Sequence, residues 1–188
     1  MDNRARILDC ALQLFASRGY DAVGVQEIAA AAGIAKPTLY HYFGSKQGLL
    51  NTLLAEWFAR LYAVIEPAAT YHGDLPLTLN RIAAAYFEFA KDNRLFYRMQ
   101  LSMWFAPIHS AVFRAVARLS EKQQQCIEDV FAQAARDHGN MTGRQRAYAA
   151  TFLGMINTYI GLSLNDYVDL TEELAHRATH QFMHGIFS

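Results

Sequence analysis

The stretch VQEIAAAAGIAKPTLYHYF, residues 25–43, decides the fold of this 188-residue chain. Its periodicity predicts two short helices, over residues 24–32 and 36–43, separated by a break of only a few residues. Gly33 suits the sharp turn between them, because glycine adopts a positive φ without a steric cost. The side chains expected to point inward and hold the second helix at a fixed angle are Ile28, Ile34 and Leu39. This pattern is typical of a helix-turn-helix.

The second short helix is expected to present Thr38, Tyr40, His41 and Tyr42 outward. Aromatic side chains exposed on a short helix are hard to explain as core. They fit a helix that enters the DNA major groove, where tyrosine hydroxyls reach phosphates and rings touch thymine methyl groups. Lys36 and Lys46 flank this helix as candidate phosphate contacts. Periodicity alone does not separate this interpretation from any other unit of three helices.

Five motifs near the amino terminus share the spacing of one known family: Gly19-Tyr20-Asp21, Ile28-Ala29, Ala32-Gly33-Ile34, Thr38-Leu39-Tyr40-His41-Tyr42-Phe43 and Ser45-Lys46. Over about the first fifty residues the chain resembles the TetR family of bacterial transcriptional regulators. The resemblance implies a homodimer in which three helices bind DNA, a fourth connects, and the rest bind a small ligand and dimerise. It also implies eight DNA-facing residues: Gln26, Lys36, Pro37, Thr38, Tyr40, His41, Tyr42 and Lys46.

The sequence departs from the family pattern at two helix starts. Gly24 and Ala35 stand where the family usually has a capping Ser or Thr, so a hydroxyl that could contact phosphate is missing. Residues 1–50 hold five Lys or Arg against four Asp or Glu, a net charge of only about +1. We therefore expect modest non-specific affinity for DNA and a shallow salt dependence.

Helical periodicity dominates the rest of the chain, and no stretch alternates like a strand. The sequence predicts an all-α protein of about nine helices, with a helix-turn-helix domain over residues 1–48 and a ligand-binding and dimerisation domain over residues 49–188. The remaining helices are expected over residues 4–17, from about 46 to Pro67, and over 77–91, 94–105, 108–138, 142–166 and 171–187.

Composition narrows the function classes. Lys plus Arg and Asp plus Glu are both 17, so any nucleic-acid site must be local rather than a product of overall charge. Cys10 and Cys126 read as buried thiols, and no signal peptide is seen, so we expect a cytoplasmic protein. No motif of a nucleophile elbow, phosphate loop or di-iron helix pair is present, so the chain is expected to be no enzyme and to need no cofactor.

The segment over residues 147–165 carries no charge. Its length raises the question of a membrane span, but its polar side chains favour a buried helix in an oligomer. A stripe of small residues, which also includes Asn165, is expected to meet a partner subunit: Ala147, Thr151, Gly154, Thr158 and Gly161. A bulky stripe is expected to face the protomer's own interior: Tyr148, Phe152, Met155, Tyr159 and Leu162. The alternative is that both stripes lie in one core.

The last helix offers a companion face for the dimer contact, made of Ala175, Ala178, Thr179, Phe182, Met183 and Ile186. An aromatic and methionine-rich set suggests a pocket for a largely apolar ligand, aromatic or acyl-bearing. Its candidate residues are Tyr86, Phe89, Met99, Met103, Trp104, Phe113, Phe152, Met155, Asn157 and Tyr159. Such residues at helical spacing also read as ordinary core. Asn157 is the one amide deep in an apolar helix, where an unpaired polar group costs about 1–3 kcal/mol.

His176, His180 and His184 lie four residues apart on the last helix, a spacing that suits a metal but also an ordinary polar face, so no metal is assigned. The function predicted is a ligand-responsive transcriptional regulator, most simply a repressor. It would bind a palindromic double-stranded DNA operator as a homodimer and be released by a small, largely apolar effector, with no membrane partner. The rival interpretations are a helical enzyme and an interaction dimer that kept the fold.

Overall fold

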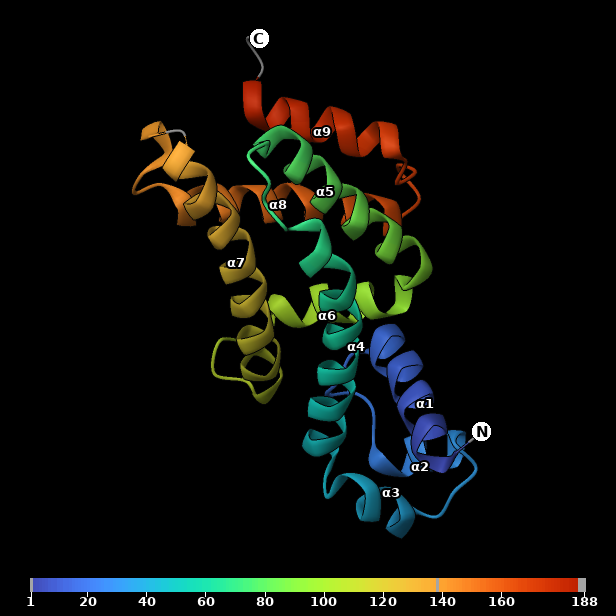
Figure 1. Ribbon diagram of the computed structural model, residues 1–188. Helices are drawn as coiled ribbons and strands as arrows, with labels where there is room; N and C mark the ends of the chain where they lie inside the picture. The colour runs from blue at the N-terminus through green and yellow to red at the C-terminus, as the bar shows by residue number, and fades with distance from the viewer. Residues whose placement is uncertain (1, 138, 186–188) are drawn as a thin grey trace. The chain divides into compact units, whose positions relative to one another are not determined.

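The computed structural model describes residues 2–137 and 139–185, and within them the chain is all-helical, with nine α-helices and no strand (Figure 1). The helices begin and end within a few residues of the predicted limits. They are α1 (Asn3–Arg18), α2 (Val25–Ala31), α3 (Lys36–Phe43), α4 (Lys46–Ala68), α5 (Leu75–Asp92), α6 (Arg94–Trp104), α7 (Ala111–Asp137), α8 (Gln145–Leu164) and α9 (Glu172–His184), with a 3-10 turn η1 (Gly139–Met141) before α8.

Four helix starts are fixed by side chains that accept a hydrogen bond from the first turn, among them Ser110, whose Oγ accepts from the Phe113 N–H at 3.0 Å at the start of α7. Asp74 accepts from the Leu77 N–H at 2.8 Å, and Thr171 accepts from the Leu174 N–H at 3.1 Å. Ser45 Oγ accepts from the Gly48 N–H at 2.9 Å at the start of α4. Each bond satisfies one of the backbone donors that a helix leaves unpaired at its amino end.

The described residues form two compact units. The first contains the residues up to Ala59 together with Leu95–Leu119, and the second contains Arg60–Arg94 together with the residues from Ser120 onward. The first unit therefore holds the three short amino-terminal helices, most of α4, all but the first residue of α6 and the start of α7. The functional boundary expected between residues 48 and 49 stays a prediction.

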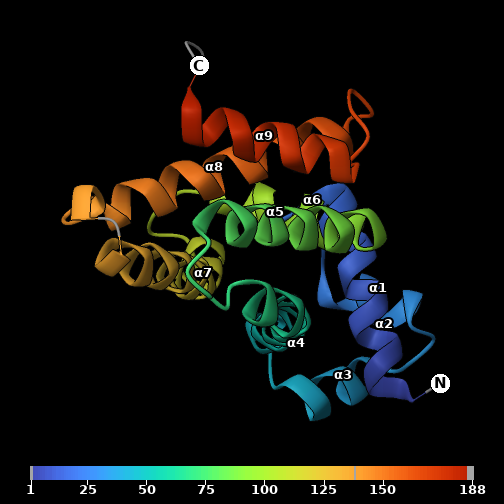
Figure 2. The same cartoon turned by 45° about the horizontal axis from the view of Figure 1, so that its top comes forward.

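In the second unit, α9 packs on α5 and α8, and α5 contacts α8 (Figure 2). The buried side of α9 consists of Leu174, Ala175, Ala178 and Thr179. Phe182 lies beside Phe152, with ring centroids 5.2 Å apart, and is also 6.2 Å from the ring of Phe131. Its own protomer therefore covers Ala175, Ala178 and Thr179, which were expected to meet a partner subunit, whereas Phe182 and Met183 are half-buried and their dimer contact stays a prediction. Ile186 lies outside the described residues.

The α8 helix turns its small side chains outward. Ala147, Thr151, Gly154 and Thr158 are exposed and Gly161 is half-buried. The buried side carries Ala149, Phe152, Ile156 and Ile160. The predicted bulky stripe is thus wrong by about one position: Phe152 is buried, but Tyr148, Met155 and Tyr159 are only half-buried, and Leu162 is 36% exposed.

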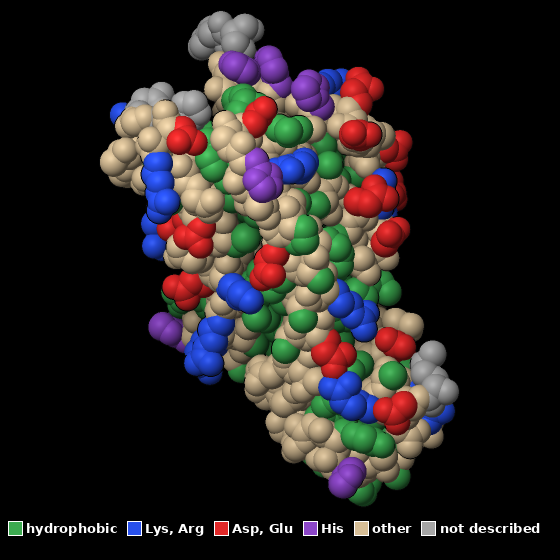
Figure 3. Space-filling view, in the orientation of Figure 1, with side chains coloured by type: hydrophobic (Ala, Val, Ile, Leu, Met, Phe, Trp, Pro, Cys, Tyr) green, Lys and Arg blue, Asp and Glu red, His purple; other side chains and the backbone are tan. Residues whose placement is uncertain are grey.

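Other expectations concern thiols, membranes and metals. Cys10 and Cys126 are free thiols, and both are half-buried, so the prediction that they are buried is wrong. Within the described ranges no helix has the length and apolar character that a membrane span requires. His180 and His184 have ring centroids 4.4 Å apart, and Figure 3 shows histidine side chains along α9. No group of three or more His, Cys, Asp or Glu in the described part of the chain is arranged to hold a metal ion.

Candidate nucleic-acid interface

The first three helices pack against one another around a common core. α1 contacts both α2 and α3, and α2 contacts α3. Ile28 and Leu39 are fully buried, as predicted, whereas Ile34 is half-buried. The main contributions from α1 are Ile7, Leu8, Ala11, Leu12 and Phe15. Burial of Leu39 and Phe43 leaves the opposite side of α3 on the surface.

The turn between α2 and α3 depends on Gly33. Its φ is +62°, which confirms the expected left-handed conformation. The Ile34 N–H donates to the Ala29 carbonyl at 3.0 Å, so the backbone closes on the end of α2 before α3 begins. A residue with a Cβ would be strained at this φ. The turn therefore sets the direction in which α3 leaves α2.

A second glycine, which the sequence analysis missed, fixes the junction between α3 and α4. A Cβ placed on Gly48 would lie 2.0 Å from the Phe43 carbonyl oxygen and 3.2 Å from the Phe43 carbonyl carbon. The backbone at the end of α3 thus approaches the first turn of α4 more closely than any side chain allows. The only sequence signal was a glycine in the first turn of a helix, which by itself does not show a close approach.

The predicted DNA-facing residues lie mostly on the surface. Gln26, Lys36, Pro37 and His41 are exposed, and Tyr40 and Tyr42 are each 40% exposed, while Thr38 is half-buried. Their rings also contact neighbours: His41 meets Tyr42 edge-on at 5.6 Å, and Lys36 Nζ lies 5.7 Å from the centroid of the Tyr40 ring. These contacts group a cation, an imidazole and two phenols on one short helix.

Lys46 differs from the other seven predicted DNA-facing residues because Tyr20 holds its ammonium group. It is half-buried, donates to the Tyr20 carbonyl, and places its ammonium 4.1 Å from the centroid of the Tyr20 ring. Burial lowers the pKa of this lysine, and the nearby Asp21 opposes the effect. The structure therefore gives Lys46 a role in holding the α1–α2 turn against α4, and its predicted phosphate contact stays a prediction.

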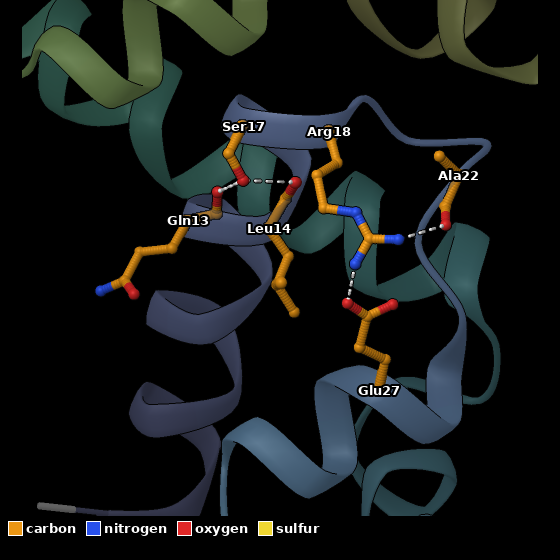
Figure 4. Close-up of polar contacts among 6 residues, drawn as sticks. All are labelled: Gln13, Leu14, Ser17, Arg18, Ala22 and Glu27. Atoms are coloured by element: carbon orange, nitrogen blue, oxygen red, sulfur yellow. Dashed lines mark hydrogen bonds and ion pairs between the residues drawn. The ribbon is translucent and has the colours of Figure 1, made fainter.

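Two arginines of this unit are also paired internally. Arg18 forms an ion pair with Glu27 and donates to the Ala22 carbonyl, linking the end of α1 to α2 (Figure 4). Arg4 forms an ion pair with Glu56 on α4. Because these charges are partly neutralised, the surface attracts phosphates less than a count of basic residues suggests.

Backbone donors remain at the helix starts on this side of the unit. Neither Gly24 before α2 nor Ala35 before α3 makes a side-chain cap hydrogen bond. In α3 the first turn offers only the Lys36 N–H, because Pro37 has none and the Thr38 N–H donates to the Ala35 carbonyl at 2.9 Å. The Lys36 N–H of α3 and the Val25 and Gln26 N–H groups of α2 can donate to a phosphate, and the helix dipole adds to the attraction. The helix starts at Gly24 and Ala35 lack a capping hydroxyl, but they thus still offer backbone N–H donors to DNA.

The ten candidate ligand residues are divided between the two units, and a pocket formed by them stays a prediction. Met99, Met103, Trp104 and Phe113 belong to the first unit and the other six to the second. Tyr86, Met99, Met103 and Phe152 are buried core, whereas Trp104 is 42% exposed and its ring lies 5.7 Å from that of Phe113. Asn157 is half-buried, so the penalty expected for a fully buried amide does not apply in full.

A different set of residues lines a cavity of about 640 Å³ in the second unit, a size within the ~300–1,000 Å³ typical of small-molecule sites. Its lining is mostly apolar and comes from five elements: Leu75, Pro76, Leu79, Phe131, Met141, Tyr148, Thr151, Phe182 and Met183. None of these was a candidate ligand residue in the sequence. Phe182 and Met183 line this cavity, and their predicted place at the dimer interface stays a prediction.

Similarity to known proteins extends from the amino-terminal helices to the whole chain. Residues 7–53 match the family model described as bacterial regulatory proteins, tetR family. The HTH-type transcriptional activator FasR of Mycolicibacterium smegmatis is 27% identical over 184 residues, covering 98% of this chain and 82% of that protein. The HTH-type transcriptional repressor KstR of the same organism is 33% identical over 138 residues, covering 72% of this chain and 64% of that protein.

The fold is also found among solved structures. The transcriptional regulator FadR from Bacillus subtilis, solved in complex with stearoyl-CoA, superposes with a TM-score of 0.82 at 19% identity. The match covers 97% of this chain and 98% of that one. At this identity the likeness concerns the fold, and the ligand is a property of that protein.

Proposed function

The chain belongs to the TetR family of bacterial regulatory proteins, and from this membership we propose a ligand-responsive repressor that binds a palindromic DNA operator as a homodimer. Its relatives are transcriptional regulators rather than enzymes, and they include both an activator and repressors. The observation that carries the proposal is the exposed face of α3, where Lys36, Tyr40, His41 and Tyr42 lie together on a helix anchored by Leu39. The expected compartment is the cytoplasm.

Contacts with DNA are proposed at two levels. Tyr40, Tyr42 and His41 would reach base edges and phosphates in the major groove, with Thr38 and Pro37 beside them. The side chains of Lys36 and Gln26, together with the first backbone N–H groups of α2 and the Lys36 N–H of α3, would contact the phosphate backbone. Lys46 would do so if DNA displaces it from Tyr20. In a dimer the two copies of α3 would stand about one helical turn of DNA apart, ~34–36 Å.

The exposed side of α8 supports the proposed dimer. Four of its small side chains are exposed, and the segment over residues 147–165 contains no charged residue that would resist burial. Small side chains let two helices approach closely, and an uncharged exposed helix face is typical of an interface between subunits. We propose that Ala147, Thr151, Gly154, Thr158 and Gly161 meet the same stripe of a second copy.

The cavity of the second unit supports a largely apolar effector, for which an acyl chain is the candidate of first choice. Phe131, Phe182 and Met183 offer dispersion contacts along its walls, and Tyr148 carries a hydroxyl group, whereas the Thr151 hydroxyl already donates to the Ala147 carbonyl at 3.0 Å. The complex of the structurally similar FadR with stearoyl-CoA makes acyl compounds reasonable first probes. In Met183→Trp the indole would fill part of the cavity, so the thermal stabilisation that an acyl ligand produces in the wild type should shrink.

We propose that α4 carries the signal, because it is one continuous helix over Lys46–Ala68. Leu49, Leu50 and Leu53 are buried near its start, and Leu61 and Ile65 are buried near its end. A ligand that shifts the end of this helix would change the spacing of the two reading helices. A difference of ~2–3 kcal/mol between the two spacings would change operator affinity roughly 30- to 150-fold.

A mobility-shift assay on DNA upstream of the protein's own gene tests the reading helix. Tyr42→Ala should weaken specific binding by about 1–3 kcal/mol, the range for a contact that reads a base. Tyr167→Ala is the matched control, since Tyr167 is 76% exposed and lies in the second unit. If the wild type and both variants bind equally and weakly, α3 is not the element that reads DNA.

A further inference from the structure

A groove of about 440 Å³ in the first unit contains none of the residues proposed to bind DNA, the effector or a second copy. One wall is the start of α4, with Gln47, Asn51 and Ala55. The other wall is the start of α7, where Arg114 and Arg118 lie on either side of Ala115. All of these residues belong to one compact unit, so the groove is a feature of that unit alone.

The two arginines make the groove cationic. They are four residues apart on α7, so their side chains project from the same face of the helix, and both are exposed. Arg114 donates to the His109 carbonyl at 2.7 Å, and no ion pair involves either arginine within the described ranges. No carboxylate is among the residues that line the groove. Figure 3 shows Lys and Arg side chains gathered over this part of α7.

The groove has open space because small alanine side chains line both of its walls. Ala55 on α4 faces the groove together with Ala115 on α7, and a larger side chain at either position would fill part of it. Their methyl groups provide apolar surface beside the guanidinium groups. The groove thus combines two cations that suit a phosphate or carboxylate with a surface that suits a short hydrocarbon.

We propose that this groove binds a small amphiphilic anion, whose phosphate or carboxylate pairs with Arg114 and Arg118 and whose apolar part lies over Ala55 and Ala115. Guanidinium groups form charge-assisted and often bidentate hydrogen bonds with both kinds of oxyanion. The anion site is separate from the apolar cavity of the second unit and has a different chemistry.

The groove also has a hydrogen-bonded connection to the turn between α1 and α2. Gln47 Nε2 donates to Asn51 Oδ1 at 2.9 Å, and the Tyr20 hydroxyl donates to Gln47 Oε1 at 3.3 Å. Tyr20 in turn holds Lys46 through its carbonyl and its ring. An anion that recruits the Gln47 amide would weaken these contacts. The binding of the anion to this groove would thereby lower operator affinity, an effect that rests on the proposed function, whereas anion binding itself does not.

Titration calorimetry on the full chain, at low and at physiological salt, tests the binding. The probes are octyl phosphate, octanoate, octanol and inorganic phosphate, which separate the head group from the tail. Octyl phosphate or octanoate should bind more tightly than octanol and inorganic phosphate. Each of Arg114→Gln and Arg118→Gln should weaken that binding about tenfold. Arg136→Gln, an exposed arginine farther along α7, should leave it unchanged.

The proposal is overturned if octanol binds as tightly as both anions, or if Arg114→Gln with Arg118→Gln binds them as well as the wild type. It is also overturned if the double variant keeps its anion affinity but loses operator affinity, because the arginines would then contact DNA phosphates. Tyr20→Phe should keep anion binding and reduce the effect of the anion on operator affinity. A wild type that binds the anion but no operator would contradict the proposed function and leave the anion site standing.

Discussion

The substitution Gly48→Ala tests whether the α3–α4 junction sets the position of the reading helix. A Cβ at residue 48 would meet the Phe43 carbonyl oxygen at 2.0 Å, whereas real Cβ contacts essentially never fall below 3.0 Å. The two groups must therefore separate by at least 1.0 Å, the difference between these distances. The obstacle is backbone at the end of α3, so no flexible side chain can move aside.

The expected cost follows from this displacement. Overpacking of this kind destabilises a protein by about 1–3 kcal/mol, and a rigid obstacle places Gly48→Ala toward the upper end. The better helix propensity of alanine returns at most about 1 kcal/mol. The net loss should therefore be about 1–2 kcal/mol. Because Phe43 ends α3, operator affinity should fall as well, even at temperatures where the variant is fully folded.

Urea unfolding followed by circular dichroism measures the first effect, and fluorescence anisotropy with labelled operator DNA measures the second. Gly139→Ala is the matched control, because a methyl group on Gly139 meets nothing within 4 Å, its φ does not lie in the left-handed region, and it lies outside the proposed dimer contact. It should be neutral or stabilising. A Gly48→Ala protein as stable as the wild type, with equal operator affinity, would refute the argument that this contact fixes the junction.

Three further outcomes follow from the same structure. Gly24→Ser should stabilise the protein by a few tenths of a kcal/mol in urea unfolding, because a serine hydroxyl supplies the α2 cap hydrogen bond that glycine lacks. Burial raises the pKa of Tyr86, so the folded protein keeps the phenol protonated at a pH where the unfolded chain loses the proton. The free energy of unfolding should therefore fall as pH rises above about 10, and Tyr86→Phe should reduce that fall. The same variant leaves the Gln123 amide without its acceptor, at a cost of about 1–3 kcal/mol. Gly154→Leu and Gly161→Leu should shift the protein toward monomer in sedimentation, and a dimer unaffected by both would exclude the α8 interface.

Local signals made the amino-terminal helices predictable. The turn at Gly33 and the cap at Ser45 act within a few residues, so the sequence contains their physical cause. The close approach at Gly48 was not predictable in the same way. It depends on how the end of α3 meets α4 in space, and a glycine in the first turn of a helix has several ordinary explanations.

The packing partners of the carboxy-terminal helices could not be predicted from local sequence signals. The apolar stripe of α9 was visible in the sequence, but a stripe does not state whether its own chain or a partner covers it; Ala178 is covered by its own protomer. The α8 segment has little polar contrast around its circumference, so its inward face could be read only to within about one position. The cavity was missed because five separate elements bring its walls together.

The charges of residues 1–50 indicate that the proposed operator contact should depend on two half-sites for its affinity. Of the five cations in these residues, Arg4 and Arg18 are paired with glutamates, the half-buried Arg6 donates to Asn3 Oδ1, and Lys46 is held by Tyr20. Lys36 thus stands out as the exposed cation on the reading helix, aided by backbone N–H groups that carry only partial charge. One such surface attracts the phosphate backbone weakly, at any sequence. Stable occupation of DNA then requires a second copy at the correct spacing, and a ligand that alters that spacing acts on the main source of affinity.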